Sequence, residues 1–276
     1  MKRACVIGWP IEHSRSPLIH GHWIRTYGID GSYTKVAVRP EEAPRFFQTL
    51  AQQGFAGCNV TLPHKRAAYE AAAVREASAE AVGVANTMWL EDGRLHCANS
   101  DTYGFMRHLE VSAPAWQAKD APVVVVGAGG AARAIVFGFL EAGVGAVRVV
   151  NRTRARAEEI AAHFGAKVHA HDWGEMRTVT GDAGVVVNTT SLGMAKQGAL
   201  DLDVSVLPAH CVVADIVYVP LETELLAHAR ARGLVAVDGL GMLLHQAVPG
   251  FEKWFGVRPE VTRELREIIV ADIEGK

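Results

Sequence analysis

The chain has 276 residues, about the length of two ordinary domains, with 49% hydrophobic and 21% charged residues. Its 28 Lys and Arg residues against 30 Asp and Glu residues leave a net charge of -2, which excludes the basic excess of a nucleic-acid-binding protein. Arg133, Glu141 and Arg148 interrupt the most hydrophobic region, so no run is long enough to span a bilayer. Pro10 and Glu12 cut the first apolar segment too short for a signal peptide. We therefore expect a cytoplasmic protein without nucleic-acid or membrane partners.

Cysteine and histidine residues indicate neither disulfides nor a metal site. Cys5, Cys58, Cys97 and Cys211 are scattered among apolar neighbours and form no C-x-x-C motif, which is typical of reduced thiols in a core. The histidines of "HGH" and "HAH" lack further ligands at useful spacing, so we interpret them as surface or core residues.

The first part of the chain alternates between strand-like and helix-like segments. Ser16 suits the cap of the first helix, Pro17 its first turn and Gly28 its end. Asp92 and Gly93 suit the turn of a hairpin. The pattern predicts strands over 4–8, 31–39 and 55–61, helices over 16–28, 40–54 and from 63 onward, and a hairpin over 84–100.

The periodicity is lost over 113–121, which indicates a linker, and a second α/β series follows it. Its apolar runs are continuous rather than alternating, as in a parallel sheet that is buried on both faces. The chain ends with helical patterns over 241–256 and 259–273. These patterns predict an α/β fold whose second half contains a parallel sheet.

The second series opens with a glycine motif, "VVVVGAGGAAR". Gly127, Gly129 and Ala132 fit G-x-G-x-x-A after a strand and at the start of a helix. The first glycine allows the tight turn, the second lets the backbone approach a pyrophosphate, and the small third residue lets helix and strand pack closely. The strand-turn-helix context favours dinucleotide binding over a glycine-rich turn without a ligand.

The next strand ends in "NRTRAR" and indicates which dinucleotide is bound. An NAD site usually has an acidic residue about 20 residues beyond the glycines, whereas Asn151, Arg152, Thr153 and Arg156 offer only donors and positive charge. Guanidinium groups bind a ribose 2′-phosphate, so the pattern favours NADP. Positive charge at a helix N-terminus is unfavourable, so arginines at this place suggest a role in binding the phosphate. Arg154 alone also fits an ordinary solvated residue at the start of a helix.

Two polar motifs lie in the first part of the chain. In "SRSP", Ser14 and Ser16 offer hydroxyls beside a helix N-terminus, which is a suitable pocket for a small carboxylate. In "CNVTLPHKRA", Asn59 and Thr61 end a strand and form one polar rim with Lys65 just beyond it.

With these motifs, the chain resembles the shikimate dehydrogenase family from end to end. The matching motifs, in order, are "GWPIEHSRSP", "NVTLPHK", "GVANT", "ANSD", "GAGGAAR", "NRTRAR", "NTTSLGM", "DIVYVPLETELL" and "DGLGMLLHQA". The resemblance implies reversible NADPH-dependent reduction of 3-dehydroshikimate to shikimate. It also implies a substrate-binding domain over 1–113, completed by 241–276, and a Rossmann-like NADP-binding domain over 114–240.

The resemblance also implies roles for individual residues. Lys65 and Asp101 would be the catalytic pair. Substrate would be held by Ser14, Ser16, Thr61, Asn86, Tyr218 and Gln246. The cofactor would be held by Gly127, Ala128, Gly129, Gly130, Ala131, Asn151, Arg152, Thr153, Arg156, Thr189, Ile216, Gly239 and Met242. Departures from the family pattern are mild: Arg15 replaces a common lysine, Ser100 a common threonine and Thr189 a common alanine.

Lys65 suits this chemistry because alcohol oxidation releases a hydride to the cofactor and a proton to a base. Burial would favour its neutral amine, whereas the charge of Asp101 would favour its ammonium form. The sequence therefore leaves open which of the two holds the proton at rest, and we expect them to titrate as a coupled pair. An ordinary surface lysine is the alternative, and the matching Asn86 and Asp101 disfavour it.

Two further functions stay open at this point. One is a broader quinate/shikimate dehydrogenase that uses NAD, although the serine pair favours the shikimate-specific type. The other is a nicotinamide-binding sensor without chemistry, against which the complete Lys65/Asp101 pair argues. The oligomeric state is also open, with a homodimer as one option.

Overall fold

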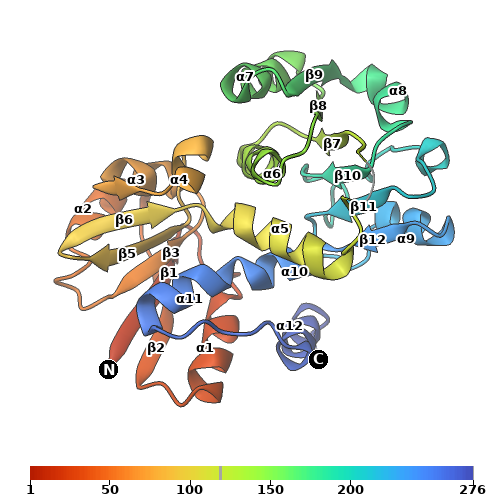
Figure 1. Cartoon of the computed structure of the whole chain (residues 1–276). Coiled ribbons are helices and arrows are strands. Elements are labelled where there is room, and N and C mark those ends of the chain that lie inside the picture. Colours follow the sequence, from red (N-terminus) through yellow and green to blue (C-terminus); the bar gives the residue numbers. More distant parts are fainter. Residues whose placement is uncertain (118–119, 276) are drawn as a thin grey trace. The chain divides into compact units, whose positions relative to one another are not determined.

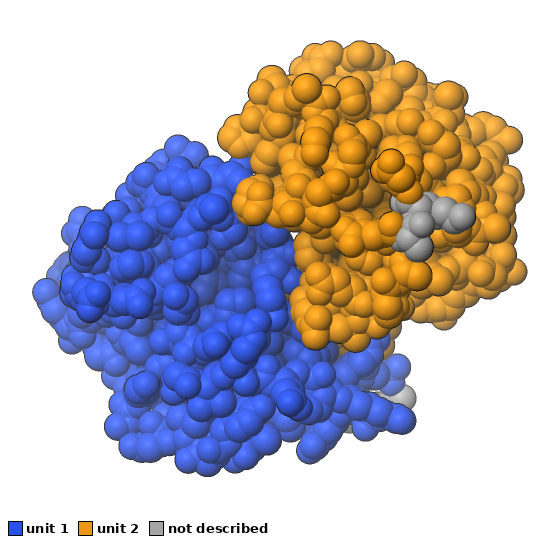
Figure 2. All heavy atoms as spheres, in the orientation of Figure 1, with its two compact units in different colours: residues 1–103, 244–276 blue, residues 104–243 orange. Residues whose placement is uncertain are grey.

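The computed structural model describes residues 1–117 and 120–275, and the chain forms two compact units (Figure 2). Unit 1 contains Met1–Tyr103 and the chain from Leu244 onward, and unit 2 contains Gly104–Leu243. The sequence predicted boundaries at 113 and 240, whereas the chain passes between the units within helices α5 (Ser100–Ser112) and α10 (Gly239–His245). The predicted linker over 113–121 includes two residues, 118 and 119, outside the described ranges.

Unit 1 is built on a mixed six-stranded sheet with the order β2-β1-β3-β5-β6-β4 (Figure 1). β1 pairs in parallel with β2 and β3, whereas β5 runs antiparallel to β3 and β6. Positive φ angles at Asp92 (50°) and Gly93 (72°) match the predicted two-residue hairpin turn. The strands are β1 (Lys2–Gly8), β2 (Gly31–Ala37), β3 (Gly57–Val60), β4 (Val74–Arg75), β5 (Thr87–Glu91) and β6 (Arg94–Ala98).

Helices cover both faces of this sheet. Apolar residues of α2, α3 and α4 form one core with alternate residues of β1, β3 and β5, and α1 and α11 pack on the sheet with an aromatic cluster. Trp254 of α11 reaches the sheet itself, because its Nε1 donates to the Met88 carbonyl at 2.8 Å. A Cβ at Gly57 would lie 2.1 Å from that nitrogen, so the close approach requires glycine. The helical segments are α1 (Ser16–Thr26), η1 (Pro40–Glu42), α2 (Ala43–Gln48), α3 (Lys65–Ala71), α4 (Ala77–Val82), α11 (Ala247–Phe255) and α12 (Arg263–Ile273).

Unit 2 has a six-stranded sheet, all parallel, with the order β12-β11-β10-β7-β8-β9. Val123 and Val125 of β7 face one buried cluster, and Val124 and Val126 face another. Both faces are therefore buried, as the continuous apolar runs predicted, and the predicted α/β fold class is confirmed. The strands are β7 (Val123–Val126), β8 (Val147–Asn151), β9 (Val168–Asp172), β10 (Val185–Asn188), β11 (Val212–Asp215) and β12 (Val235–Val237).

Several elements differ from the sequence prediction. The helix predicted over 241–256 is two helices, α10 and α11, and α12 begins only at Arg263. The sequence reading also missed α4, α5 and β9. β9 is an edge strand with a half-exposed, polar sequence, so it lacks the apolar run of its neighbours. The remaining helical segments are α6 (Gly130–Glu141), α7 (Arg154–Phe164), η2 (Trp173–Glu175), α8 (Met176–Thr180), η3 (Val204–Val206) and α9 (Glu224–Ala231).

Candidate active site

Polar residues gather at one edge of the unit 1 sheet because of the strand directions. β1 and β3 are parallel, so the segments that follow them leave the sheet at the same edge. These segments carry the serine pair and Lys65. β5 is antiparallel to β3, and β6 to β5, so Asn86 before β5 and Asp101 after β6 reach that edge as well.

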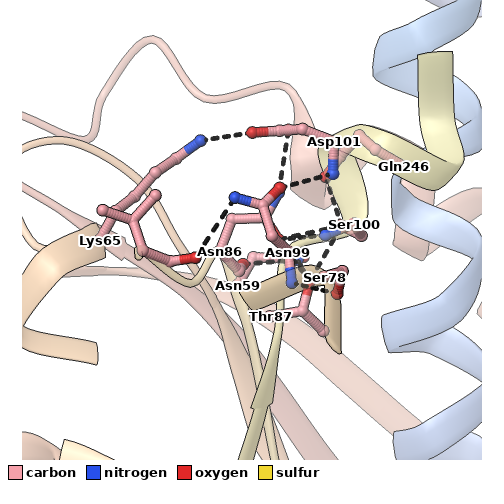
Figure 3. Close-up of polar contacts among 10 residues, drawn as sticks. Asn59, Lys65, Ser78, Asn86, Thr87, Asn99, Ser100, Asp101 and Gln246 are labelled. Atoms are coloured by element: carbon pink, nitrogen blue, oxygen red, sulfur yellow. Dashed lines mark hydrogen bonds and ion pairs between the residues drawn. The ribbon is translucent and has the colours of Figure 1, made fainter. Parts of the chain in front are cut away.

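Lys65 and Asp101 form an ion pair at this edge (Figure 3). Lys65 is the first residue of α3 and Asp101 lies in the first turn of α5. The Lys65 Nζ donates to Asp101 Oδ2 at 2.8 Å, and Asn86 Nδ2 donates to Asp101 Oδ1 at 2.9 Å. The side chains of Lys65 and Asp101 are 26% and 16% exposed, so the pair is sheltered but reachable. A solvated surface lysine would have no such arrangement.

Gln246, which follows α10 in the sequence, joins the same cluster. The Ser100 hydroxyl oxygen lies 3.3 Å from Gln246 Oε1 and 3.1 Å from Asn86 Oδ1, and either oxygen can accept its single hydrogen. The structure thus brings together Lys65, Asp101, Asn86 and Gln246, which are far apart in sequence. We call these four residues and Ser100 the lysine cluster.

The serine pair lies at the start of α1, with one difference from the sequence prediction. Ser16 is the first helical residue rather than the cap: Arg15 occupies the N-cap position, and its side chain makes no capping bond. Instead, Ser14 Oγ accepts from the Ser16 amide at 3.3 Å. Arg15 Nε donates to Asp272 Oδ2 of α12 at 2.8 Å, which ties this loop to the C-terminal helix. Thr61 lies beside the end of β1, because its amide donates to the Ile7 carbonyl of that strand at 2.9 Å.

Asn59 is not on the polar rim that the sequence predicted, because it points into unit 1. It is only 5% exposed, and its Oδ1 accepts from the Tyr33 hydroxyl at 2.6 Å and lies 3.2 Å from His20 Nε2. His20 is fully buried and stacks on Tyr33 with ring centroids 4.0 Å apart. Burial lowers the pKa of His20 to about 3, although its hydrogen bond to Asn59 opposes the shift. His20 is therefore a core histidine, one of the two options that the sequence allowed.

The glycine loop of unit 2 has the geometry of a pyrophosphate site. Gly127 has a φ of +110°, and a Cβ there would lie 2.6 Å from Thr189 Oγ1, so the turn requires glycine. Gly129 is the N-cap of α6 and, as a glycine, leaves the first amides of this helix without a side-chain cap. A Cβ at Gly129 or Gly130 would meet no protein atom within 4 Å, so protein packing does not explain these two glycines. Close approach by a phosphate does explain them, and the residues therefore fit the dinucleotide.

The arginines after β8 divide into two kinds. Arg154 donates to Glu158 Oε1 and to Asp172 Oδ2, both at 2.9 Å. Arg152 and Arg156 are exposed, and their side chains make no ion pair or hydrogen bond within residues 1–117 and 120–275. The sequence analysis found no acid in "NRTRAR", but β9 brings Asp172 beside Asn151 as its register partner. Because Arg154 binds that acid, Arg152 and Arg156 are left available for a phosphate.

The residues predicted to line the nicotinamide all belong to unit 2. Thr189 Oγ1 donates to the Val126 carbonyl at 2.8 Å, which ties it to the end of β7. Gly239 contacts the residue after β11 closely, because a Cβ there would lie 2.3 Å from the Ile216 carbonyl oxygen. Met242 packs against the buried cluster of β7 and α6. Tyr218 also lies in unit 2, so its contact with the serine pair stays a prediction.

One residue that sequence reasoning missed, Asp215, holds the loop after β11. Asp215 is 2% exposed and accepts from Asn188 Nδ2 at 3.0 Å, the Val217 amide at 3.0 Å and Thr223 Oγ1 at 2.8 Å. Burial raises the pKa of Asp215, and these three donors oppose the shift. The acid within the apolar run "CVVADIVY" was the available signal, since a buried carboxylate needs partners. The loop that Asp215 anchors carries Ile216 and Tyr218.

Comparison with known families identifies the family of this chain. The model described as "Shikimate dehydrogenase substrate binding domain" matches residues 6–88. "Shikimate / quinate 5-dehydrogenase" matches 110–197, and "Shikimate 5'-dehydrogenase C-terminal domain" matches 239–263. The chain belongs to the shikimate dehydrogenase family. The family predicted from the motifs is therefore confirmed.

Individual relatives cover the whole chain. The shikimate dehydrogenase (NADP(+)) of Azorhizobium caulinodans is 56% identical over 276 residues, which are 100% of this chain and 98% of the relative. The Thermus thermophilus enzyme, solved with NADP(H) and shikimate, is 33% identical with a TM-score of 0.84, covering 99% of this chain and 100% of the other. Quinate dehydrogenase from Corynebacterium glutamicum, solved with NAD, is 30% identical with a TM-score of 0.88, covering 97% and 98%.

No helix in the described ranges is long and apolar enough to cross a membrane. No group of three or more His, Cys, Asp or Glu residues in that part of the chain could hold a metal ion.

Proposed function

We propose that the chain catalyses the reversible NADPH-dependent reduction of 3-dehydroshikimate to shikimate, a step of the shikimate pathway of aromatic amino acid biosynthesis. The observation that carries this proposal is the lysine cluster, in which the sheltered Lys65 donates to the Asp101 carboxylate and the Asn86 amide holds that carboxylate from its other oxygen. Family membership and the glycine loop support the choice of an NADP-dependent oxidoreductase.

Lys65 moves the proton in the proposed reaction. Bound NADPH supplies the hydride to the carbonyl carbon, and Lys65 Nζ donates a proton to the carbonyl oxygen. In the reverse direction Nζ accepts the hydroxyl proton. Asp101 orients Nζ through its Oδ2, and Asn86 Nδ2 holds Asp101 through its Oδ1.

The substrate carboxylate is held by the hydroxyls of Ser14 and Ser16 at the start of α1, with Tyr218 as a third donor. The amide N–H groups of the first helical turn favour an anion at this position. The ring hydroxyls are held by Thr61, Asn86 and Gln246. Unit 1 is therefore the substrate domain, and apart from Tyr218 its polar edge supplies all the proposed contacts to a small, oxygen-rich acid.

Unit 2 is the NADP-binding domain. The loop Gly127–Ala131 receives the pyrophosphate, and Asn151, Arg152, Thr153 and Arg156 bind the adenosine ribose and its 2′-phosphate. Thr189, Ile216, Gly239 and Met242 line the nicotinamide. The nearest acid on the neighbouring strand, Asp172, is neutralised by Arg154. This arrangement favours NADP over NAD and disfavours the broader quinate/shikimate alternative. A cytoplasmic location and a homodimer stay predictions.

The test is turnover measured by the absorbance of NADPH. Purified enzyme is assayed with shikimate or quinate as substrate and with NADP or NAD as acceptor. The proposal expects the highest kcat/KM for shikimate with NADP. Equal kcat/KM for quinate and shikimate, or for NAD and NADP, would favour the broader dehydrogenase. Binding of NADP without any turnover would favour the sensor.

A further inference from the structure

Two buried hydroxyl groups lie directly beneath Asn86, and the reaction as described gives them no role. Thr87 is the first residue of β5 and Ser100 the first of α5, and they are 1% and 2% exposed. Their hydroxyl oxygens are 3.0 Å apart. Figure 3 draws both residues in the group of polar contacts that also contains Asn86 and Asp101.

The hydrogen bonds around Asn86 define which way its amide faces. Asn86 Oδ1 accepts from the Ser100 backbone amide at 2.8 Å and from Thr87 Oγ1 at 3.0 Å. A backbone N–H can only donate, so the atom that faces it must be the amide oxygen. The Asn86 NH₂ group then faces Asp101 Oδ1, at 2.9 Å.

A second backbone group identifies the Asn59 amide nitrogen. The Asn86 backbone carbonyl can only accept, so the Asn59 atom that lies 3.3 Å from it is the amide nitrogen. The same Asn59 nitrogen lies 3.4 Å from Thr87 Oγ1, and this oxygen therefore accepts there. The single hydroxyl hydrogen of Thr87 has two acceptors in reach, Asn86 Oδ1 and Ser100 Oγ, both at 3.0 Å, and we assign it to Asn86 Oδ1.

We propose that Thr87 and Ser100 are positioning residues that hold the Asn86 amide with its oxygen inward and its NH₂ group on Asp101; this rests on the roles proposed above for Asn86 and Asp101. A half-turn of the amide would set its oxygen against Asp101 Oδ1 and its NH₂ group against the Ser100 amide, and both contacts are repulsive. Without the Thr87 hydroxyl, the inward orientation loses a donor, Asp101 loses its restraint at Oδ1, and the position of Lys65 Nζ on Oδ2 becomes less defined.

The first experiment removes the hydroxyl without changing the shape of the side chain. Thr87→Val should lower kcat/KM for shikimate about five- to tenfold, with little change in KM for NADP, because one buried hydrogen bond is lost. Thr87→Ser should restore kcat/KM to within about twofold. Thr180→Val is the matched control, since Thr180 is a fully buried threonine of unit 2 whose hydroxyl donates to the Met176 carbonyl. It should lower the melting temperature without lowering kcat/KM.

A double-mutant cycle separates positioning from a general loss of structure. If Thr87 acts through Asn86, Thr87→Val should lower kcat/KM less than twofold in an Asn86→Ala background. An equal fall in both backgrounds, no rescue by Thr87→Ser, or no fall in the wild-type background would overturn the proposal. If Thr87→Val fails to fold, Ser100→Ala removes the other hydroxyl, keeps the backbone donor and enters the same cycle with the same expectation.

A spectroscopic measurement tests the positioning independently of the reaction. In protein labelled with ¹⁵N-asparagine, the Asn86 NH₂ signal is identified by its loss in Asn86→Ala. Its hydrogens should exchange slowly with solvent in the wild type and about tenfold faster in Thr87→Val. An unchanged exchange rate would contradict the proposal. Absence of shikimate turnover in the wild type, with this difference in exchange retained, would instead count only against the proposed function.

Discussion

The lysine cluster of unit 1 and the proposed cofactor site of unit 2 are organised in different ways. The cofactor site contains the loop Gly127–Ala131 and the side chains of Arg152 and Arg156. In the lysine cluster, the functional groups of Lys65, Asp101 and Asn86 are bonded to one another before any substrate is present. In unit 2, the exposed side chains of Arg152 and Arg156 have no ion-pair or hydrogen-bond partner in the described part of the chain. The comparison suggests that the reacting groups are preorganised by the protein, whereas the cofactor groups are completed by their ligand.

The largest effect should come from breaking the preorganised pair. Lys65→Ala should lower kcat by roughly 10²–10⁴, the usual range for a proton-transfer group, with a much smaller change in KM for shikimate. Lys253→Ala is the matched control, since Lys253 pairs with Glu76 in the same unit but outside the cluster. Steady-state kinetics of both variants provide the check. Near-wild-type kcat in Lys65→Ala would show that another group moves the proton.

Loss of the serine pair should weaken substrate binding in unit 1 alone. In the Ser14→Ala, Ser16→Ala double variant, each lost hydrogen bond to the carboxylate should cost about 1.5–3 kcal/mol, or roughly ten- to hundredfold in Kd for shikimate. The Kd for NADP should hardly change, because the glycine loop belongs to the other unit. Calorimetry with each ligand measures both values. A similar loss of NADP binding in a folded variant would contradict the assignment.

Loss of Arg152 and Arg156 should change the cofactor preference of unit 2. Exposed ion pairs are individually weak, so we expect a preference for NADP over NAD of roughly ten- to thousandfold in kcat/KM. The Arg152→Ala, Arg156→Ala variant should lose most of this preference by weakening NADP, while its activity with NAD stays near the starting value. Arg177→Ala, which changes an exposed arginine paired with Asp203, is the control. An unchanged preference in the double variant would exclude these arginines as the phosphate site.

The smallest effect concerns the buried histidine beneath the lysine cluster. The pKa of His20 is about 3 in the folded chain and about 6.5 when unfolded, so the unfolded state binds the extra proton between these values. The stability that His20 contributes is therefore present above pH 6.5 and is lost as the pH falls toward 3. This loss should amount to about 1 kcal/mol between pH 6.5 and 5.5. Urea unfolding of His20→Gln should show a shallower pH dependence than the wild type or the exposed control His228→Gln. Equal slopes would mean that His20 is not neutral in the fold.

Much of the fold and site could be predicted from the sequence because the signals are local. The turn at Gly127, the helix that follows it and the arginines after β8 lie within one supersecondary unit, so consecutive residues carry the pattern. The hairpin at Asp92 and Gly93 is equally local. The family resemblance added the pairing of Lys65 with Asp101, which spacing alone does not indicate.

The sequence by itself determined the α/β class and the dinucleotide loop, because each depends on residues that are neighbours along the chain. The tertiary structure decided which side chains meet. Strand register turns Asn59 inward toward His20 and Tyr33, and brings Asp172 beside Asn151. Pairing of β3, β5 and β6 brings Asn86 and Asp101 to the edge that Lys65 occupies. The physical reason is that a side chain's hydrogen-bond partners are set by strand direction and register, and a shift of one residue would turn each of them to the opposite face of the sheet.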